Sequence, residues 1–317
     1  MAALISIIIV NWNGMKYIRE CLDSLLSQTY PDIEIILVDN ASSDGSVEYV
    51  RKNYPSVKLI ESTTNLGFAG GTNLGIREAK GELIALFNQD AVADRLWLEK
   101  LAGAINISED IAAVAGKIYY WGDERERNTI FCTWAKVDPR KALAYNFLDE
   151  RPQADVDYLP GCAMLIKRKV IEDIGLLDES YFLYFEETDW CARAIRAGYR
   201  LVYVPGSVAW HVVSGSIGNP YAKLAYITRN RVRFALKNFD LSCIPAFIYA
   251  FTRETARGFL MGMSGGGFNE FEIHIRAIGW NILHSVGTAA ARRRDLSNIS
   301  NRRSYNHSLP LRSIRWE

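Results

Sequence analysis

Three acidic residues stand close together in the segment YFLYFEETDWCARAIRAG, residues 181–198. Glu186, Glu187 and Asp189 follow an aromatic run and would begin a helix. Acids are favoured at a helix N-terminus because the helix dipole is positive there, which would account for the cluster without any chemistry. Apolar neighbours could instead raise the pKa of one carboxyl group until it suits a general base. The residues alone leave both interpretations open.

Two further clusters place a carboxylate directly after an apolar run. In VDNASSDGS, residues 38–46, Asp39 could accept the N3–H of uracil or thymine, while Asp44 could cap the following helix. In LFNQDA, residues 86–91, Asp90 could hold a divalent cation that bridges two phosphates. Turn formation and helix capping would also account for either cluster if it stood alone.

The segment NLGFAGGTNLG, residues 65–75, brings four glycines in front of a helical pattern. Glycines let the backbone approach a diphosphate at a helix N-terminus, although a glycine-rich turn needs no ligand. The spacing matches neither G-x-G-x-x-G after the first strand nor G-x-x-x-x-G-K-[ST]. A dinucleotide oxidoreductase and a P-loop NTPase therefore both fit poorly. His211, in VAWHVVSGS at 208–216, is a further candidate ligand or an ordinary packed histidine.

These clusters follow elements that alternate between two periodicities. Apolar, β-branched runs of strand length occupy residues 4–10, 33–38, 57–60 and 82–87. Helical spacing recurs between and after them, at residues 17–26, 47–54, 72–79 and 96–105. The alternation predicts an α/β fold with a Rossmann-like, mostly parallel sheet and helices on both faces. Ligands of such sheets bind at the carboxyl ends of the strands, where the polar clusters fall.

The rest of the chain predicts a second, helical part. Residues 118–157 are charged, aromatic and irregular, which indicates an insertion or an acceptor-binding region. Helices are expected at 167–174 and 187–197, a strand at 201–204, and then helices that break at 264–267 and resume at 270–291. We therefore expect a nucleotide-binding and catalytic domain over residues 1–215. Residues 216–317 would form a helical region with a basic tail.

Composition narrows the class of protein. With 317 residues, 49% of them hydrophobic and 23% charged, the chain can bury a large core, which excludes overall disorder. Five scattered cysteines without a C-x-x-C pair argue against a zinc knot or a disulfide framework, and predict reduced thiols in the cytoplasm. The start of the chain lacks the basic region of a signal peptide, and no apolar run reaches the ~18 residues of a membrane span.

The charge is unevenly distributed, although the net charge is only +1. Residues 292–317 hold seven arginines against two acids, so the remainder is mildly acidic. Nucleic-acid binding by the body is therefore not expected. The basic tail predicts a peripheral contact with an anionic membrane surface, at its inner face.

Together the motifs resemble the family 2 glycosyltransferases, and within them the rhamnosyltransferase-like branch. The matching segments occur in order and cover the chain from residue 4 to residue 235. They are IIIVNWNG at 7–14, VDNASSDGS, NLGFAGGTNLG, LFNQD at 86–90, LPGCAMLIKRKVIEDIGLLDESYFLYFEETDWCARAIRAG at 159–198, WH at 210–211 and YITRNRVRF at 226–234.

The resemblance implies a GT-A fold and transfer, with inversion, from a dTDP- or UDP-sugar to a glycan, polysaccharide or lipid-linked acceptor. By likeness the sugar would be L-rhamnose. Asp39 would recognise the base, and Mg²⁺ or Mn²⁺ would be held by Asp90 and His211. The nucleotide-sugar site would comprise Val10, Asn11, Asn13, Asp39, Asn65, Gly67, Gly70, Gly71, Asn73 and Asn88.

Two positions depart from the family pattern. Asn88-Gln89-Asp90 stands where the family has Asp-x-Asp, so Asp90 must hold the metal without a second acid. Glu187 stands at the second position of the Glu-Asp motif that supplies the general base, and Asp189 is its rival. These departures support one alternative, a non-catalytic protein that kept the fold. The other alternative, a sugar nucleotidyltransferase, usually has a basic glycine-rich loop where this chain has only VNWNGMKY.

Overall fold

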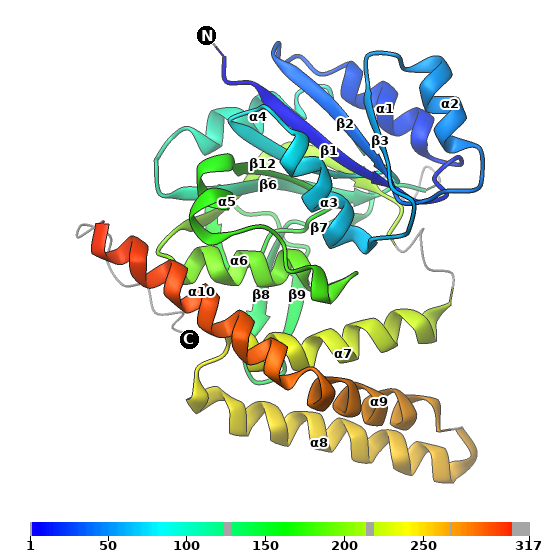
Figure 1. Cartoon of the computed structure of the whole chain (residues 1–317), viewed down its shortest axis with the longest axis vertical. Helices are drawn as coiled ribbons and strands as arrows, with labels where there is room; N and C mark the ends of the chain where they lie inside the picture. Colours follow the sequence, from blue (N-terminus) through cyan, green and yellow to red (C-terminus); the bar gives the residue numbers. More distant parts are fainter. Residues whose placement is uncertain (1, 123–127, 214–218, 267, 306–317) are drawn as a thin grey trace.

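The computed structural model describes residues 2–122, 128–213, 219–266 and 268–305. A mixed β-sheet with helices on both faces forms its centre, and further helices pack below it (Figure 1). The strands are β1 (Ile5–Asn11), β2 (Ile33–Asp39), β3 (Lys58–Glu61), β4 (Leu83–Asn88), β5 (Ala91–Ala93), β6 (Ile111–Tyr120), β7 (Ile130–Cys132), β8 (Trp134–Asp138), β9 (Leu143–Phe147), β10 (Ala154–Val156), β11 (Ala163–Lys167) and β12 (Arg200–His211). The α-helices are α1 (Ile18–Leu26), α2 (Ser46–Asn53), α3 (Gly67–Glu78), α4 (Trp97–Ile105), α5 (Arg168–Ile174), α6 (Glu186–Arg196), α7 (Pro220–Asn238), α8 (Ile244–Met261), α9 (Asn269–Leu283) and α10 (Ser285–Tyr305).

The first four strands form the parallel part of the sheet, in the order β3-β2-β1-β4. Their β-branched apolar runs suit strands that are covered on both faces. The register pairs Asn11 with Asp39 and Val10 with Asn88, so the carboxyl ends of β1, β2 and β4 lie side by side. The predicted α/β sheet and its common polar edge are therefore confirmed.

The second half of the sheet is mixed. Strand β11 runs antiparallel between β4 and β6, and β12 runs parallel to β6. The short strand β5 pairs antiparallel with β12, and its register sets Ala91 opposite His211. This pairing brings the end of β4 next to the end of β12, although the two lie more than a hundred residues apart in the chain.

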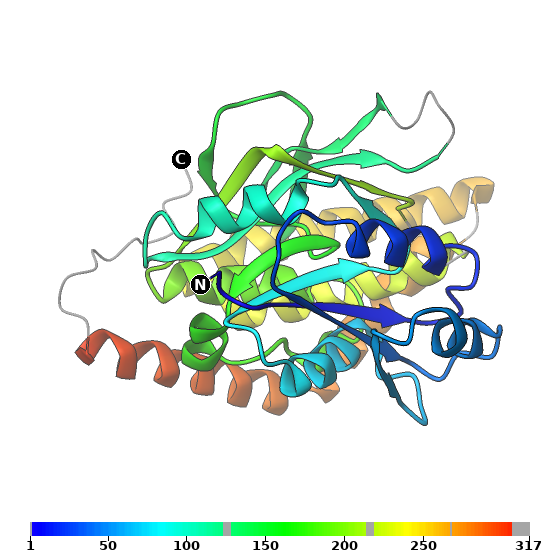
Figure 2. The ribbon, with the colours of Figure 1, turned by 90° about the horizontal axis from the view of Figure 1, so that it is seen from above.

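The side chains of each strand alternate between two apolar layers. Ile5, Ile7 and Ile9 of β1 pack with α1 and α4, whereas Ile8 belongs to the opposite layer with α3, α5 and α6. Figure 2, seen from above, shows α1 and α4 on one side of the strands and α3 on the other. Helices cover both faces of the sheet, as the sequence predicts, and the polar edge is fixed by this double packing.

Helices α7 to α10 form the C-terminal layer. Helix α7 packs against α6, α9 and α10, and α8 packs against α9. Phe234 and Phe239 at the end of α7 join Phe247 and Phe251 of α8 in one buried aromatic cluster. Helices α8 and α9 run side by side at the bottom of Figure 1. No helix among the described residues is long and apolar enough to cross a membrane.

Three predicted elements differ from the structure. The helix predicted over 72–79 already begins at Gly67, because its glycines pack against the sheet instead of forming a loop. The region 118–157, predicted to be irregular, contains β7 to β10, whose short strands carry too weak a pattern to recognise. The helix predicted over 270–291 is interrupted at His284, where α9 ends and α10 begins.

The first part of the predicted basic tail is a docked helix. Arg292 donates hydrogen bonds from Nη1 to the carbonyl oxygens of Leu236 and Phe239 at the end of α7, at 2.9 and 2.8 Å. Asp295 is buried, and its Oδ2 lies 3.1 Å from Nζ of Lys237. The predicted tail residues Arg312 and Arg315, and the predicted boundary at 215/216, lie outside the described residues.

Candidate active site

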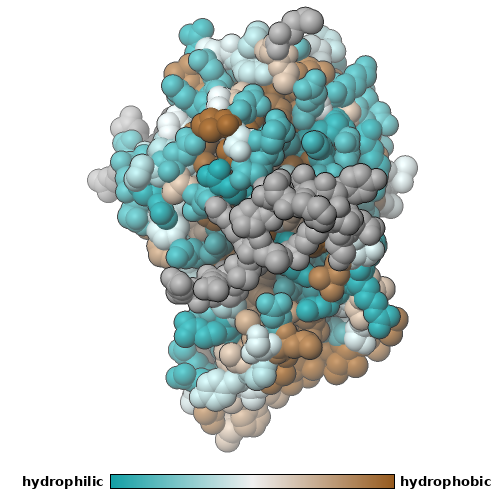
Figure 3. All heavy atoms as spheres, turned by 90° about the vertical axis from the view of Figure 1, so that its left-hand side faces the viewer, coloured by the Kyte–Doolittle hydropathy of each residue, from teal (hydrophilic) through white to brown (hydrophobic). Residues whose placement is uncertain are grey.

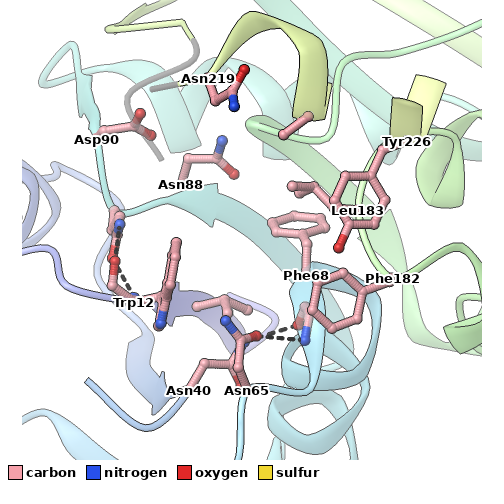
Figure 4. A pocket seen from close by; sticks show the side chains of 14 residues that line it. Trp12, Asn40, Asn65, Phe68, Asn88, Asp90, Phe182, Leu183, Asn219 and Tyr226 are labelled. Carbon is pink, nitrogen blue, oxygen red and sulfur yellow. Dashed lines mark hydrogen bonds between the residues drawn. The ribbon is translucent and has the colours of Figure 1, made fainter. Parts of the chain in front are cut away.

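A pocket opens at the carboxyl ends of β1 and β4, between the start of α3 and the start of α7. Its volume is about 410 Å³, within the range of pockets that hold small ligands. Figure 4 shows two kinds of wall: Asn88, Asp90 and Asn219 lie on one side, and aromatic rings lie on the other. The lining residues are Val10, Trp12, Asn40, Asn65, Gly67, Phe68, Asn88, Gln89, Asp90, Phe182, Leu183, Asn219, Ala222 and Tyr226.

Asp90 and His211 meet at the polar side of the pocket because β5 pairs with β12. His211 Nε2 lies 3.1 Å from Asp90 Oδ1 and 3.1 Å from Asn88 Nδ2. Burial lowers the pKa of His211, but interactions with Cys162 and Asp90 outweigh this and raise it to about 10. The structure thus brings both predicted metal ligands together, with Asn88 beside them.

The same corner offers few other ligands for a metal. Oδ1 of Asn88 is buried and has no hydrogen-bond partner among the described residues. Across the described part of the chain, no group of three or more His, Cys, Asp or Glu side chains is placed to hold a metal. A cation here would therefore take a carboxylate oxygen and an imidazole nitrogen from the protein, and most of its ligands from elsewhere.

Asp39 lies just behind the pocket wall, in a polar network at the ends of β1 and β2. Its Oδ1 accepts from Asn11 Nδ2 at 2.8 Å, and its Oδ2 accepts from the Ser42 amide at 3.0 Å. Asn13 Oδ1 accepts from the Ser43 amide at 2.8 Å. Asn11, Asn13 and Asp39 are thus brought next to one another, but they do not line the pocket itself.

The predicted glycine-rich residues divide into one at the pocket and others that pack. Gly67 lines the pocket with a φ of +71°, and a Cβ there would lie 2.4 Å from the carbonyl oxygen of Phe182. A Cβ on Gly71 would lie 2.8 Å from Val10, so this glycine lets α3 approach β1 closely. A Cβ on Gly70 would lie 2.8 Å from Leu66, the residue directly before α3, so this contact is local to the helix start.

Asn73, the last polar residue of that motif, faces away from the pocket. Its side chain bonds the backbone of Leu177, with Oδ1 accepting from N–H at 3.1 Å and Nδ2 donating to the carbonyl at 2.9 Å. It therefore ties α3 to the chain that precedes α6. Asn65 and Val10, by contrast, line the pocket.

The two glutamates at the start of α6 are incompletely bonded; Glu186 is buried and Glu187 is half-buried. Tyr158 donates its hydroxyl to Oε1 of Glu187 at 2.9 Å. Oε2 of Glu186 and Oε2 of Glu187 have no hydrogen-bond partner among the described residues. Burial raises the pKa of both carboxyl groups, and the charge of Glu187 raises that of Glu186 further. A carboxylate with a raised pKa and an unbonded oxygen can accept a proton near neutral pH.

The turn that leads into α6 is strained. Phe182, Tyr184 and Phe185 all have φ between 64° and 75°, a conformation that costs on the order of 1–3 kcal/mol per non-glycine residue. Asn230 of α7 holds this turn, because its Nδ2 donates to the carbonyl oxygens of Leu183 and Tyr184 at 2.8 and 2.7 Å. This turn therefore connects the pocket residues Phe182 and Leu183 directly to the two glutamates at the start of α6.

Asp189 has a very different environment, although it lies in the same first turn of α6. It is fully buried and accepts from Lys237 Nζ at 2.8 Å, Arg193 Nε at 2.9 Å and Asn238 Nδ2 at 2.8 Å. Burial raises the pKa of Asp189, but the charges of Lys237 and Arg193 outweigh this and lower it. The structure therefore places Asp189 in an ion network and away from the pocket.

Several pocket residues were not predicted from the sequence. Trp12 exposes 39% of its surface at the pocket, and Gln89 holds its backbone through bonds of 2.7 and 3.1 Å. Phe182 stacks on Tyr226 of α7, with ring centroids 5.7 Å apart. Trp12 and Gln89 lie inside the motifs IIIVNWNG and LFNQD, so their place at the site could have been predicted from the sequence. The contact of Phe182 with Tyr226 joins distant segments, and no sequence pattern indicates it.

The sequence of the chain is similar to those of known proteins. The profile of glycosyl transferase family 2 matches residues 6–175, more than half of the chain. Glycosyltransferase GlyG of Streptococcus pneumoniae is 35% identical over 187 residues, which cover 57% of this chain and 60% of that protein. The N-acetylglucosaminyl-diphospho-decaprenol L-rhamnosyltransferase of Mycobacterium tuberculosis is 25% identical over 251 residues, which cover 71% of this chain and 81% of that protein. This chain covers less than two thirds of the length of GlyG and of a Rickettsia typhi glycosyltransferase that it also matches.

Solved structures show the same architecture at low sequence identity. GalNAc-T7 with UDP, GalNAc and Mn²⁺ is similar over 89% of this chain and 57% of that chain, with a TM-score of 0.62 and 16% identity. The mannosyltransferase PcManGT of Pyrobaculum calidifontis, in complex with GDP-Man and Mn²⁺, is similar over 95% of this chain and 87% of that chain, with a TM-score of 0.54 and 17% identity. The predicted GT-A fold is confirmed, and the chain belongs to glycosyl transferase family 2.

Proposed function

We propose that this protein transfers a sugar, with inversion, from a nucleotide-diphosphate sugar to a hydroxyl group of an acceptor. The observation that carries the proposal is the meeting of Asp90 and His211 at the carboxyl end of β4, on the wall of a pocket of suitable size. Family 2 membership argues against the nucleotidyltransferase alternative. Turnover separates the proposal from the non-catalytic alternative.

The donor's base would lie at the ends of β1 and β2. Asp39 is proposed to accept the base N3–H, because a carboxylate that already accepts two hydrogen bonds has further lone pairs. Trp12, partly exposed at the pocket, offers a ring face beside that position. The polar side of the pocket would receive the diphosphate, with Asn65 and Asn88 as donors from their amide groups.

The residues at the polar corner fit a divalent cation. Asp90 presents an oxygen, and His211 would present a nitrogen 3.1 Å away once a cation has displaced the proton that its raised pKa retains. Asn88 adds a buried oxygen without a hydrogen-bond partner among the described residues. Mg²⁺ or Mn²⁺ held there would supply positive charge for the leaving diphosphate. Structures of similar fold contain Mn²⁺ beside a nucleotide, which supports this assignment.

Glu187 is proposed as the general base. The acceptor hydroxyl oxygen bonds to the anomeric carbon, the bond from that carbon to the diphosphate oxygen breaks, and the hydroxyl proton passes to Oε2 of Glu187. Its raised pKa and its unbonded oxygen favour this role. Asp189, the rival candidate, is proposed to be structural because its oxygens are taken by Lys237, Arg193 and Asn238.

The identities of the sugar and of the acceptor are proposed from similarity to known proteins. L-rhamnose from a dTDP donor, and a lipid-linked or polysaccharide acceptor, are proposed from the similarity to the mycobacterial L-rhamnosyltransferase. Its name gives a lipid-diphosphate acceptor, which would place this protein in the cytoplasm at the inner face of a membrane. The acceptor would approach over the region 118–157, of which β8 and β9 form a separate two-stranded sheet.

Calorimetric titration with UDP and dTDP, with and without Mn²⁺, tests the donor site. We expect Asp39→Ala to weaken binding under both conditions and Asp90→Ala to weaken it only when Mn²⁺ is present. Asp32→Asn, at the exposed opposite end of β2, is the matched control and should change neither. Binding of no nucleotide by the wild type would overturn the proposal, and metal-independent loss at Asp90 would make that residue structural.

A further inference from the structure

The outer face of α8 carries exposed apolar residues in two groups. Ile248 and Tyr249 form the first group, and Phe259 and Leu260 form the second, which Met263 extends just past the end of the helix; between 41% and 70% of the surface of each is exposed. Thr252 and Ala256 lie between the two groups on the same face, and together these residues are called the α8 stripe. Isolated exposed apolar residues are ordinary, but several grouped on one helix face mark an interaction surface. The buried residues of α8 lie on its other face, which packs against the neighbouring helices.

Helix α9 carries a second stripe beside the first. Ile275, Ile278 and Ile282, together with Val286 at the start of α10, are exposed by 47%, 37%, 66% and 81%. Phe259 of α8 contacts both rings at the start of α9, Phe268 and Phe271, with centroids 5.9 and 5.2 Å apart. The two helices are therefore direct neighbours.

Both stripes lie on the side of this hairpin that faces away from α7. Phe251 of α8 faces Arg231 of α7, whose guanidinium lies 5.5 Å from the ring. Asn281 of α9 donates to the carbonyl oxygen of Arg229 of α7 at 2.9 Å. These inward contacts come from faces other than the stripes, so both stripes stay exposed on neighbouring helices and together are called the apolar surface of the hairpin. Figure 3 shows apolar side chains gathered over this lower part of the molecule.

Positive charge borders the apolar surface. Arg253 and Arg257 lie one turn apart along the edge of the α8 stripe, both exposed, and neither forms an ion pair with a described residue. Two of the three acids on α8 and α9 are already paired, Glu254 with Arg231 and Glu272 with Arg276. The charge left free along the α8 stripe is thus positive, which complements an anionic surface.

We propose that the α8–α9 hairpin is an in-plane anchor that docks the protein on an anionic lipid bilayer. An apolar helix face flanked by arginines lies in the interface with its side chains among the acyl chains and its cations at the headgroups. A second copy of this chain would bring a like-charged edge and no matching row of free acids. The bilayer contact therefore lies on α8 and α9, whereas the start of the basic tail is occupied with the body through Arg292 and Asp295.

The anchor is joined directly to the pocket wall. Arg229 of α7 is held between the rings of Tyr226 and Trp280, 4.9 and 4.7 Å from their centroids. Tyr226 lines the pocket and Trp280 belongs to α9. The hairpin therefore fixes the pocket at a set height above the bilayer. If the proposed function holds, an acceptor carried by a lipid would meet the pocket at that height.

Vesicle flotation of the full chain tests the anchor, with phosphatidylcholine vesicles made with and without phosphatidylglycerol. The triple variant Ile248→Gln, Leu260→Gln, Ile282→Gln should lose binding at least ~100-fold, because three exposed apolar side chains that would enter the bilayer are replaced by polar ones. Arg253→Gln with Arg257→Gln should lose about 30-fold on anionic vesicles only, because each arginine contributes about 1 kcal/mol there. Hydrogen exchange should show lipid protection over α8 and α9.

Matched variants distinguish the hairpin from the tail and from the rest of the surface. Ile107→Gln with Leu148→Gln changes exposed apolar residues outside the hairpin and should leave binding unchanged. Arg293→Gln with Arg294→Gln should reduce binding less than the α8 arginine pair does, whereas a larger loss would move the contact to the tail. Light scattering without lipid reports self-association. A dimer that the triple variant dissociates, together with no vesicle binding, would overturn the proposal. Nucleotide titration remains an independent measure of the proposed function.

Discussion

Glu187 and Asp189 lie two residues apart in the first turn of α6, yet their surroundings are opposite. Both are carboxylates, but Asp189 is fully buried and Glu187 is half-buried. Glu187 bonds the Tyr158 hydroxyl and keeps an oxygen without a partner among the described residues. Asp189 lies between Lys237 and Arg193, so its negative charge is fully compensated. The pKa of Glu187 is therefore raised, which favours proton exchange, whereas the pKa of Asp189 is lowered, which favours its charged form.

The surroundings of the two carboxylates, and not their shared acidity, distinguish the proposed base Glu187 from Asp189 in the ion network. In the network around Asp189, Asp178 pairs with Arg233 and Lys237, which lower its pKa although burial raises it. These pairs tie the start of α6 to α7. The strained turn at 182–185 connects the pocket wall to Glu187, which does not itself line the pocket. The ion pairs of Asp178 and Asp189 thus hold the backbone around α6 in place, while Glu187 on the same helix keeps an oxygen without a hydrogen-bond partner among the described residues.

Removing the proposed base should have the largest effect. Glu187→Gln keeps the size of the side chain but cannot accept the proton, so transfer should fall about 10² to 10⁴-fold, or roughly 3–5 kcal/mol of barrier. Initial rates with a donor and acceptor measure the loss, and calorimetry should show unchanged donor binding. Glu187→Asp restores the carboxylate and should recover part of the rate. Near wild-type transfer by Glu187→Gln would show that another group is the base.

Breaking the ion network should change stability and leave chemistry nearly intact. Asp189→Asn removes the buried acid that Lys237 and Arg193 share and leaves these two cations only Asp178 and Asp295, so the free energy of unfolding should fall by about 3–5 kcal/mol. Urea denaturation measures this, and transfer per folded molecule should stay within an order of magnitude of wild type. Collapse of transfer in well-folded Asp189→Asn would give Asp189 the catalytic role instead.

The pH dependence of stability provides a second check on the same residue. The pKa of Asp189 is lowered in the folded state, so its stabilisation is complete above the unfolded value of about 3.9 and is lost as the pH falls below it. Asp189→Asn should therefore flatten the acid side of the stability curve. Glu61→Gln, which breaks the exposed pair with Arg51, is the control and should change neither stability nor its pH dependence.

The alternating first third of the fold was predictable, because β1 to β4 are uninterrupted apolar runs with helical spacing between them. Strands β7 to β10 were not, since each has only three to five residues and is defined by distant partners. The start of α3 was placed too late because its glycines favour a loop locally. In the fold, Gly71 is required by the close approach of Val10, a tertiary contact that no local pattern records.

The candidate site was predictable in its residues more than in their roles. The resemblance gave Asp90 and His211, and the antiparallel pairing of β5 with β12 explains why residues so far apart in the chain meet. Local pattern could not distinguish Glu187 from Asp189, because the cations that pair Asp189 come from α6 and from the distant α7. The sequence also could not show that the predicted base-recognising residue Asp39 bonds Asn11 of the neighbouring strand, because this contact joins residues of two different strands.

The smallest expected effect concerns the hydrogen bond from Tyr158. The bond stabilises the charged form of Glu187 and so lowers its pKa against the opposing effect of burial. In Tyr158→Phe the pKa of Glu187 should rise further, and at acidic pH less of the base would be ionised. In the pH profile of the transfer rate, the acid limb should therefore move to higher pH, and the rate at pH values above that limb should change little. Tyr203→Phe removes another buried hydroxyl, one without a hydrogen-bond partner among the described residues, and should leave the limb in place. An unmoved limb in Tyr158→Phe would mean that the group titrating in the profile is not Glu187, even if Glu187→Gln is slow.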